Sequence, residues 1–327
     1  MDDLLVARAS RLADDLLLPA AAEVDRADLV PRAHLDRLAA EGLYGLAGPT
    51  ELGGLGADRA TAARVTEVLA GGCLATTFVW LQHAGVVRRL AGAEDAVRHR
   101  WLPQLCRGEL RAGVALAGVR PGPEPVRVTR DGDGWLLDGT CPWVTGWGLV
   151  DVLHVAARTD DGGVAWFVVD AGSGPTCSVE RQRLVAVDAS STVTVAWSGH
   201  RVPGDRLTSS TTDAQWRDDD ARGLRGNGSL ALGVAGRCAA LLDDDALRGD
   251  VDAARTALDA ASVAELPGAR AGAAMLAWRA AGRLVVGHGS RAVLRGQHAE
   301  RLAREAAFLL VFGTRPAIRD ALLDRLG

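Results

Sequence analysis

Residues 101–118 read WLPQLCRGELRAGVALAG, and the hydrophobic pattern changes within this stretch. Before Gly108 the apolar residues recur at helical spacing, whereas the run after Arg111 is short and apolar, as in a buried strand. The stretch therefore predicts the point at which a helical region ends and a region of strands begins, and we place that boundary at residue 110.

The chain on either side of this boundary continues the two patterns. Residues 1–110 show leucines at helical spacing, interrupted by the glycine-rich loop GLAGPTELGGLG at residues 45–56. Residues 111–206 contain short apolar runs separated by Asp-Gly turns, which is typical of a small sandwich or barrel. Helical periodicity returns over residues 207–327. We therefore predict an α+β multidomain fold with an N-terminal helical domain, a middle β-barrel and a C-terminal helical bundle.

The composition excludes several classes of protein. The chain has 327 residues, of which 48% are hydrophobic and 24% charged, and its net charge is −4. These values are ordinary for a globular protein and disfavour disorder or a broad nucleic-acid-binding surface. All basic residues are arginine, which excludes lysine nucleophiles and a P-loop lysine. The five cysteines lie singly, without the spacing of a zinc site, and we expect no metal.

Familiar short motifs are absent from the sequence. The loop at residues 45–56 matches neither GxGxxG nor a P-loop, and a nucleophile elbow or HExxH pattern does not occur. The uncharged run at residues 68–87 is long enough to span a bilayer, but Gly71 and Gly72 interrupt it. Since no signal peptide precedes it either, we expect a cytoplasmic protein without membrane or nucleic-acid partners.

Five strings, in order along the chain, carry a resemblance to the acyl-CoA dehydrogenase family. They are EGLYGLAGPTELGGLG (41–56), WLPQLCRGELRAGVALAG (101–118), DGDGWLLDGTCPWVTG (131–146), HRVPGDRL (200–207) and HAERLAREAAFLLVFGT (298–314). Each string is short, but together they follow the family's order and spacing over most of the chain. The resemblance implies the family's fold, in which FAD lies between the β-barrel and the C-terminal bundle.

The resemblance also implies a reaction and its partners. Family members are oxidoreductases that oxidise the Cα–Cβ bond of an acyl-CoA, and we expect an acyl-CoA or acyl-carrier thioester as substrate. An unactivated C–C bond requires a cofactor that accepts hydride, and a carboxylate base must lie at the α carbon. The family's bundle packs on other subunits, which implies a homo-oligomer or a hetero-oligomer with an acyl-CoA dehydrogenase homologue.

The resemblance assigns cofactor contacts to four residues. Trp143 and Thr145 match the family's Trp-Ile-Thr, which borders the flavin ring, and the Thr145 hydroxyl would bond the flavin. Thr314 matches the threonine of the C-terminal Tyr-Glu-Gly-Thr string, and Leu116 falls at an apolar position next to the ring. We therefore expect Leu116, Trp143, Thr145 and Thr314 to contact FAD.

A further part of the resemblance concerns the substrate. Thr77, Trp80 and His83 fall where the family partly lines its acyl pocket. From the pattern alone, a histidine in an apolar helix is more often a hydrogen-bonded core residue than a ligand. We keep these three residues as candidates for the acyl pocket.

The sequence departs from the family pattern at positions that carry the chemistry. Phe312 stands where the family has its catalytic glutamate, and a phenyl ring cannot accept a proton. Residues 117–123 read AGVRPGP, so a threonine and a serine that contact the ligands in the family are missing. The catalytic residue is therefore unknown, and Asp219, Asp220 and Glu265 are the candidates for a substitute base.

These departures leave three interpretations open. The chain is an FAD-dependent acyl-CoA dehydrogenase-like oxidoreductase with another base, either homomeric or as one subunit of a mixed assembly. Alternatively, it is a non-catalytic subunit that pairs with an acyl-CoA dehydrogenase homologue. In the third interpretation the fold is repurposed, for example as a flavin monooxygenase or as a flavin-free binding protein. An acid close to the acyl α carbon would favour the first of these.

Overall fold

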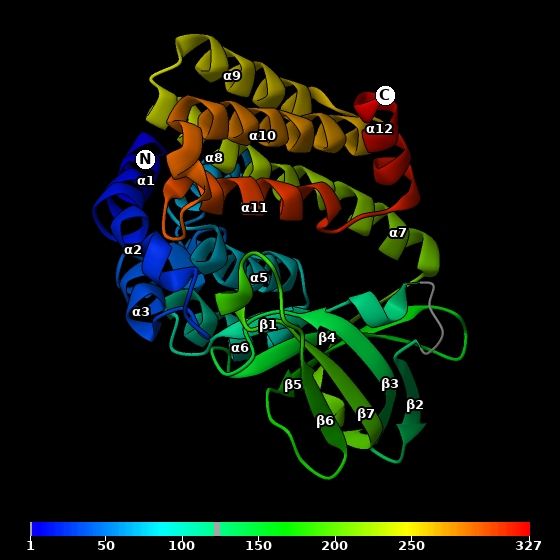
Figure 1. The fold of residues 1–327 in the computed structure, drawn as a ribbon. Coiled ribbons are helices and arrows are strands. Elements are labelled where there is room, and N and C mark those ends of the chain that lie inside the picture. Colours follow the sequence, from blue (N-terminus) through cyan, green and yellow to red (C-terminus); the bar gives the residue numbers. More distant parts are fainter. Residues whose placement is uncertain (1, 121–124) are drawn as a thin grey trace.

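The N-terminal region is helical throughout in a computed structural model that describes residues 2–120 and 125–327 (Figure 1). Asp58 begins one helix because its carboxylate accepts a hydrogen bond from the backbone N–H of Thr61 at 2.7 Å. Gly108 ends another because it adopts a φ of 70°. The helices are α1 (Asp2–Leu12), α2 (Leu18–Val24), α3 (Arg32–Ala40), α4 (Arg59–Gly72), α5 (Leu74–Ala91) and α6 (Asp95–Arg107).

The middle region forms one sheet of eight strands among the described residues. The strands are β1 (Ala112–Ala115), β2 (Arg127–Asp131), β3 (Gly134–Val144), β4 (Val152–Arg158), β5 (Val164–Asp170), β6 (Cys177–Arg181), β7 (Val193–Val202) and β8 (Leu207–Thr211). Their order is β6-β7-β3-β2-β4-β5-β8, with β1 parallel to β4. The edges β6 and β8 do not pair with each other in this order, so the sheet is open and the predicted barrel is not closed by hydrogen bonds.

The sheet continues past the boundary that we expected at residue 206. Strand β8 covers Leu207–Thr211 and pairs antiparallel with β5, so these residues belong to the sheet and not to the C-terminal bundle. The sequence pattern did not indicate this strand, because its residues, LTSST, are mostly polar and lie at a sheet edge. Residues 121–123 of the divergent stretch 117–123 lie outside the described residues.

Helices return after β8 and complete the predicted α+β fold, which is confirmed. They are α7 (Asp213–Arg222), α8 (Leu224–Leu242), α9 (Asp245–Ala260), α10 (Leu266–His288), α11 (His298–Val311) and α12 (Pro316–Leu326). Figure 1 shows α8, α9, α10 and α11 running side by side, with α5 between this bundle and the sheet. Within the described residues, no helix is both long and apolar enough to cross a bilayer.

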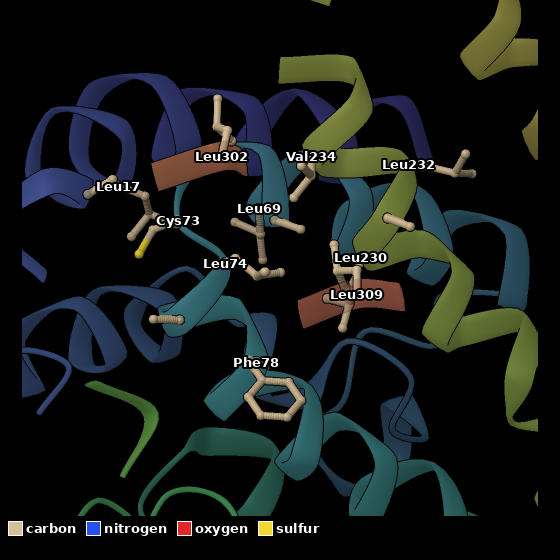
Figure 2. Packing of buried hydrophobic residues seen from close by; sticks show 14 of the residues in the cluster. Leu17, Leu69, Cys73, Leu74, Phe78, Leu230, Leu232, Val234, Leu302 and Leu309 are labelled. Carbon is tan, nitrogen blue, oxygen red and sulfur yellow. The ribbon is translucent and has the colours of Figure 1, made fainter. Parts of the chain in front are cut away.

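The largest buried cluster joins the two helical regions. Figure 2 shows Leu69, Phe78, Leu230 and Leu309 packing together from α4, α5, α8 and α11. Helices α4 and α8 approach closely because Gly233 has no side chain. A Cβ at Gly233 would lie only 2.3 Å from the carbonyl oxygen of Glu67. The N-terminal and C-terminal helices therefore share one core, which fixes the position of α5 relative to α11.

All five cysteines are buried, and none forms a disulfide. They are Cys73, Cys106, Cys141, Cys177 and Cys238. Each of the three regions of the chain contains at least one of them. The described residues contain no group of three or more histidine, cysteine, aspartate or glutamate side chains placed to hold a metal.

Candidate functional site

The end of β3 carries two of the four predicted cofactor residues. Trp143 is 61% exposed, whereas Thr145 is 2% exposed. The Thr145 hydroxyl lies 3.1 Å from the Thr192 hydroxyl, which lies 3.0 Å from the hydroxyl of Ser190. We call Thr145, Thr192 and Ser190 the hydroxyl chain. Thr145 thus faces this chain and not the surface, and its predicted hydrogen bond to a flavin stays a prediction.

The backbone around the hydroxyl chain is strained. Trp143, Val187 and Ser191 have φ values of 64°, 54° and 49°, and they are three of the four non-glycine residues with positive φ in the described chain. Such a conformation costs on the order of 1–3 kcal/mol per residue and tends to occur at functional sites. The backbone N–H of Gly146 donates to the carbonyl of Ser190 at 2.9 Å, which holds the two strained segments together.

The end of α11 faces α5 through three phenylalanines. The ring of Phe78 in α5 lies edge-on to Phe312 at 5.0 Å and to Phe308 at 5.4 Å, measured between centroids. Phe308 and Phe312 stack on each other at 5.6 Å. We call these residues the aromatic trio. Phe312, where the resemblance would place a glutamate, is therefore part of the packing between α5 and α11.

The three predicted pocket residues lie in the core instead. Thr77, Trp80 and His83 are each at most 1% exposed. The hydroxyl of Thr77 donates to the carbonyl of Cys73 at 2.9 Å, and the indole of Trp80 donates to the carbonyl of Leu43 at 3.1 Å. Their polar atoms therefore have hydrogen-bond partners within the protein, and their contact with an acyl group stays a prediction.

His83 links α5 to the sheet. Its Nδ1 accepts a hydrogen bond from the backbone N–H of Ala112 at 3.0 Å, which leaves Nε2 to donate to the carbonyl of Leu105 at 3.1 Å. Burial lowers the pKa of His83 to about 3, so the imidazole is neutral. His83 thus links α6, α5 and β1, and its place in an acyl pocket stays a prediction.

Asp220 in α7 joins two segments that the resemblance assigns to the cofactor. Its Oδ1 accepts a hydrogen bond from Arg120 at 2.9 Å, and its carboxylate accepts two from Arg315 at 2.6 and 2.8 Å. Arg120 lies in the segment of Leu116, and Arg315 directly follows Thr314. We call Arg120, Asp220 and Arg315 the Asp220 clamp.

None of the three candidate bases is a free carboxylate. Burial raises the pKa of Asp220, but the hydrogen bonds and charges of Arg315 and Arg120 outweigh it and hold the pKa below its usual value. Asp219 pairs with Arg89 at 3.5 Å. Glu265 is exposed and accepts hydrogen bonds from the Ser262 hydroxyl and backbone, which lower its pKa. All three acids thus have structural partners.

Arg270 in α10 holds the end of α11 from the interior. It is fully buried, and its Nη2 donates to the carbonyls of Leu309 at 2.7 Å and Phe312 at 3.3 Å. A cation is favoured at these C-terminal carbonyls of a helix. Burial lowers the pKa of Arg270 to about 10, so it stays charged at neutral pH. Since Arg315 donates to the carbonyl of Gly313 at 2.5 Å, the turn after α11 is held from two sides.

We call the hydroxyl chain, the aromatic trio and the Asp220 clamp, together with the flanking residues Leu116, Trp143 and Thr314, the seam. A Cβ at Gly146 would lie 3.5 Å from Val79 of α5, the neighbour of Phe78. At the other end, Phe312 leads directly through Gly313 into the clamp. The segments that contain Leu116 and Thr314 are thus linked through Asp220, whereas Trp143 and Thr314 share no hydrogen-bond partner among the described residues.

Sequence analysis missed the aromatic trio and the clamp. A signal for the trio existed, because three of the chain's four phenylalanines form it and two of them are four residues apart, one in α11 and one directly after it. A signal for the clamp did not, since its members are separated by 95 and 100 residues. Two surface hollows, of about 740 and 410 Å³, lie away from the seam beside Asp244 and Asp3.

Comparison with known proteins identifies the family. The family model "Acyl-CoA dehydrogenase, N-terminal domain" matches residues 2–109. The human mitochondrial short-chain specific acyl-CoA dehydrogenase is 26% identical over 207 residues, which cover 60% of this chain and 50% of that enzyme. The chain belongs to the acyl-CoA dehydrogenase family. Its matched part spans about half the length of such curated relatives.

Solved structures of this family share the fold over the whole chain. A probable acyl-CoA dehydrogenase from Mycobacterium abscessus superposes with a TM-score of 0.85 at 22% identity, covering 99% of this chain and 98% of that one. An acyl-CoA dehydrogenase from Bacillus anthracis, complexed with FAD, gives a TM-score of 0.84 at 17% identity over 99% of this chain and 66% of that one. At these identities the similarity establishes the fold alone.

Proposed function

We propose that this chain is an acyl-CoA dehydrogenase-like oxidoreductase subunit that binds FAD at the seam. It acts on an acyl thioester together with a homologous chain that supplies the catalytic carboxylate. The aromatic trio is the observation that carries this proposal. A phenyl ring accepts no proton and the three candidate carboxylates of this chain are paired, so we assign the base that removes the α proton to another chain.

The accessible residues of the seam support a flavin held mainly by surface contacts. Trp143 and Thr314 are exposed and Leu116 is half-buried, so each has surface to offer a ring or a phosphate. Thr145 does not fit this role, because its hydroxyl bonds Thr192 inside the sheet. FAD, when bound, supplies the hydride acceptor for a C–C bond. The complex of a family member with FAD supports the same assignment.

The positions of the acids support a second subunit. A base must lie within hydrogen-bond reach of the proton that it removes, and Asp220 and Asp219 are held by arginines. The resemblance implies that some members of this family form mixed assemblies. A homologous chain with the glutamate at the position of Phe312 would complete the reaction, while this chain contributes contacts from its own seam.

A flavin-free member of the family is the second candidate function. The observation in its favour is the burial of Thr145, which removes the one hydroxyl that the family resemblance assigns to the flavin ring. In that case the fold would serve as a binding protein, and the purified chain would stay colourless with FAD and with any homologue.

The visible absorption spectrum tests the proposal. We would record it for the protein alone, after addition of FAD, and after co-expression with a homologous acyl-CoA dehydrogenase. A flavin band that forms with the homologue and is bleached by an acyl-CoA is the expected result. Bleaching in the lone protein would contradict the need for a partner. A protein that stays colourless throughout would contradict the flavin assignment.

The variant Phe312→Glu tests whether an acyl thioester reaches the seam. If it does, the flavin-loaded protein should bleach with acyl-CoA at least about 100-fold faster than the control Phe312→Gln, because general-base catalysis contributes roughly that factor. Glutamine has a similar size and polarity, so it reproduces the disturbance of the aromatic trio without providing a base. Equal rates in the two variants would show that the acyl group lies elsewhere.

A further inference from the structure

We propose that Asp220 is a positioning residue that holds the Leu116 segment and the Thr314 turn in one fixed relation. The inference rests on the proposed function in one respect only, namely that FAD is the ligand which these two segments would contact. The clamp itself is argued from the ion pairs of Asp220 with Arg120 and Arg315.

The clamp connects three parts of the fold that no regular secondary structure joins. Arg120 follows β1 in the sheet region, Asp220 lies near the end of α7, and Arg315 precedes α12. Their side chains are 28%, 16% and 19% exposed, so the charges are only partly screened by water. Removing one partner from such a group costs more than removing one from a surface pair, because it leaves the others uncompensated.

The hydrogen bonds of the two arginines show that Asp220 is the common partner. Arg315 uses Nε and Nη2 on the Asp220 carboxylate and Nη1 on the carbonyl of Gly313, so all of its nitrogens are engaged. Arg120 donates from Nη2 to the same carboxylate, while its buried Nε has no hydrogen-bond partner within residues 2–120 and 125–327. Without the carboxylate, two guanidinium groups would face each other and repel.

The two segments that the clamp joins contain few backbone hydrogen bonds of their own. The first is a single 3₁₀ turn at Ala117–Val119, in which the backbone N–H of Arg120 donates to Ala117 at 3.2 Å. In the second, the N–H of Thr314 donates to Val311 at 3.2 Å, after Gly313 with a φ of 62°. Such short turns open easily unless tertiary contacts hold them, and for both the clamp provides such a contact.

Helix α7 provides a matched control. Asp218 lies two residues before Asp220 and pairs with Arg222 of the same helix at 2.7 Å. Both side chains of this pair are about half exposed, and the pair joins no separate segments. Asp218→Asn therefore removes the same charge from the same helix without touching the clamp.

Hydrogen exchange followed by mass spectrometry tests the clamp in the full-length protein. In Asp220→Asn, peptides covering residues 114–120 and 309–316 should exchange about tenfold faster, while Asp218→Asn leaves both unchanged. Asp220→Glu keeps the charge and should restore slow exchange at least in part. Unchanged exchange in either peptide of Asp220→Asn would overturn the proposal, as would equally fast exchange in the Asp218→Asn control.

Titration with FAD separates this inference from the proposed function. In protein that binds FAD, alone or with a homologue, Asp220→Asn should weaken FAD binding about tenfold and Asp220→Glu should recover most of it. Faster exchange with unchanged FAD affinity would overturn the positioning role. If the wild-type protein binds no FAD under any condition, the proposed function fails, and the exchange data alone decide whether Asp220 fixes the two segments.

Discussion

The sheet side and the helix side of the seam differ in what stabilises their conformation. On the sheet side, an exposed Trp143 and the buried hydroxyl chain are held by a strained backbone at Val187 and Ser191. On the helix side, the aromatic trio packs between regular helices. Strain persists only where the surrounding structure imposes it, whereas aromatic packing is stabilising by itself. The difference indicates that the conformation of the sheet side depends on the structure around it, whereas the packing of the helix side is favourable by itself.

The largest expected effect concerns two aromatic residues, one from each side. Phe78→Ala should lower the free energy of unfolding by about 3 kcal/mol, because a 5% exposed ring that contacts both Phe308 and Phe312 is lost. Trp143→Ala, which removes a 61% exposed ring at positive φ, should change it by less than about 1 kcal/mol. Urea denaturation measures both. Similar losses in the two variants would mean that Trp143 is packed in solution.

The next effect is a loss of stability in acid that both sides share. Burial lowers the pKa of His83, on the helix side, and of His154, in β4, to about 3. An unfolded imidazole titrates near 6.5, so below that pH the unfolded state binds protons that the folded state does not. Stability is therefore complete above pH 6.5 and falls as the pH decreases toward 3, by about 2 kcal/mol per histidine between pH 7 and pH 5.

Variants assign this loss to each histidine. His154→Gln and His83→Gln should each be less stable than wild type at pH 7, because they disturb buried hydrogen bonds. Between pH 7 and pH 5, each should lose about 2 kcal/mol less than wild type. The exposed His99→Gln serves as the control and should follow wild type. A wild-type protein equally stable at both pH values would contradict the buried neutral state of both residues.

The smallest expected effect tests the strain on the sheet side. Ser191→Gly should raise the free energy of unfolding by about 0.5–1 kcal/mol, because glycine adopts a φ of 49° without steric cost. Ser198→Gly, at an exposed position in β7, should lower it by a similar amount, because glycine weakens a strand. Thermal or urea denaturation would measure these two changes in the free energy of unfolding, which should have opposite signs. A destabilising Ser191→Gly would show that the backbone there is not strained.

Local patterns were sufficient to predict much of the fold. Helical spacing before Gly108 and apolar runs after Arg111 correspond to the end of α6 and the start of β1. The polar strand β8 and the open edges of the sheet were not predictable, because strand pairing at an edge depends on partners far away in sequence. The pattern of a single segment contains no information on such partners.

Residues of the candidate site could be predicted only where a single short motif determines their position. Phe312 was singled out because a string of neighbouring residues sets its position, and the structure shows what that position contacts. The orientation of Thr145 and the burial of Thr77 and Trp80 depend on which side of an element faces the core, which residue type alone does not settle. The Asp220 clamp depends on three distant segments, and a sequence read segment by segment does not join them.

The five buried cysteines allow unfolding of this chain to be followed by chemical modification of its own thiols. Because each thiol is shielded, and burial raises the pKa of Cys141 to about 11 and of Cys238 to about 12, alkylating reagents should modify them only after local or global unfolding. Cys73 lies between α4 and α5, Cys141 lies in β3 and Cys238 in α8. The order in which the thiols are alkylated would therefore record, without any engineered label, whether the sheet or the helices separate first.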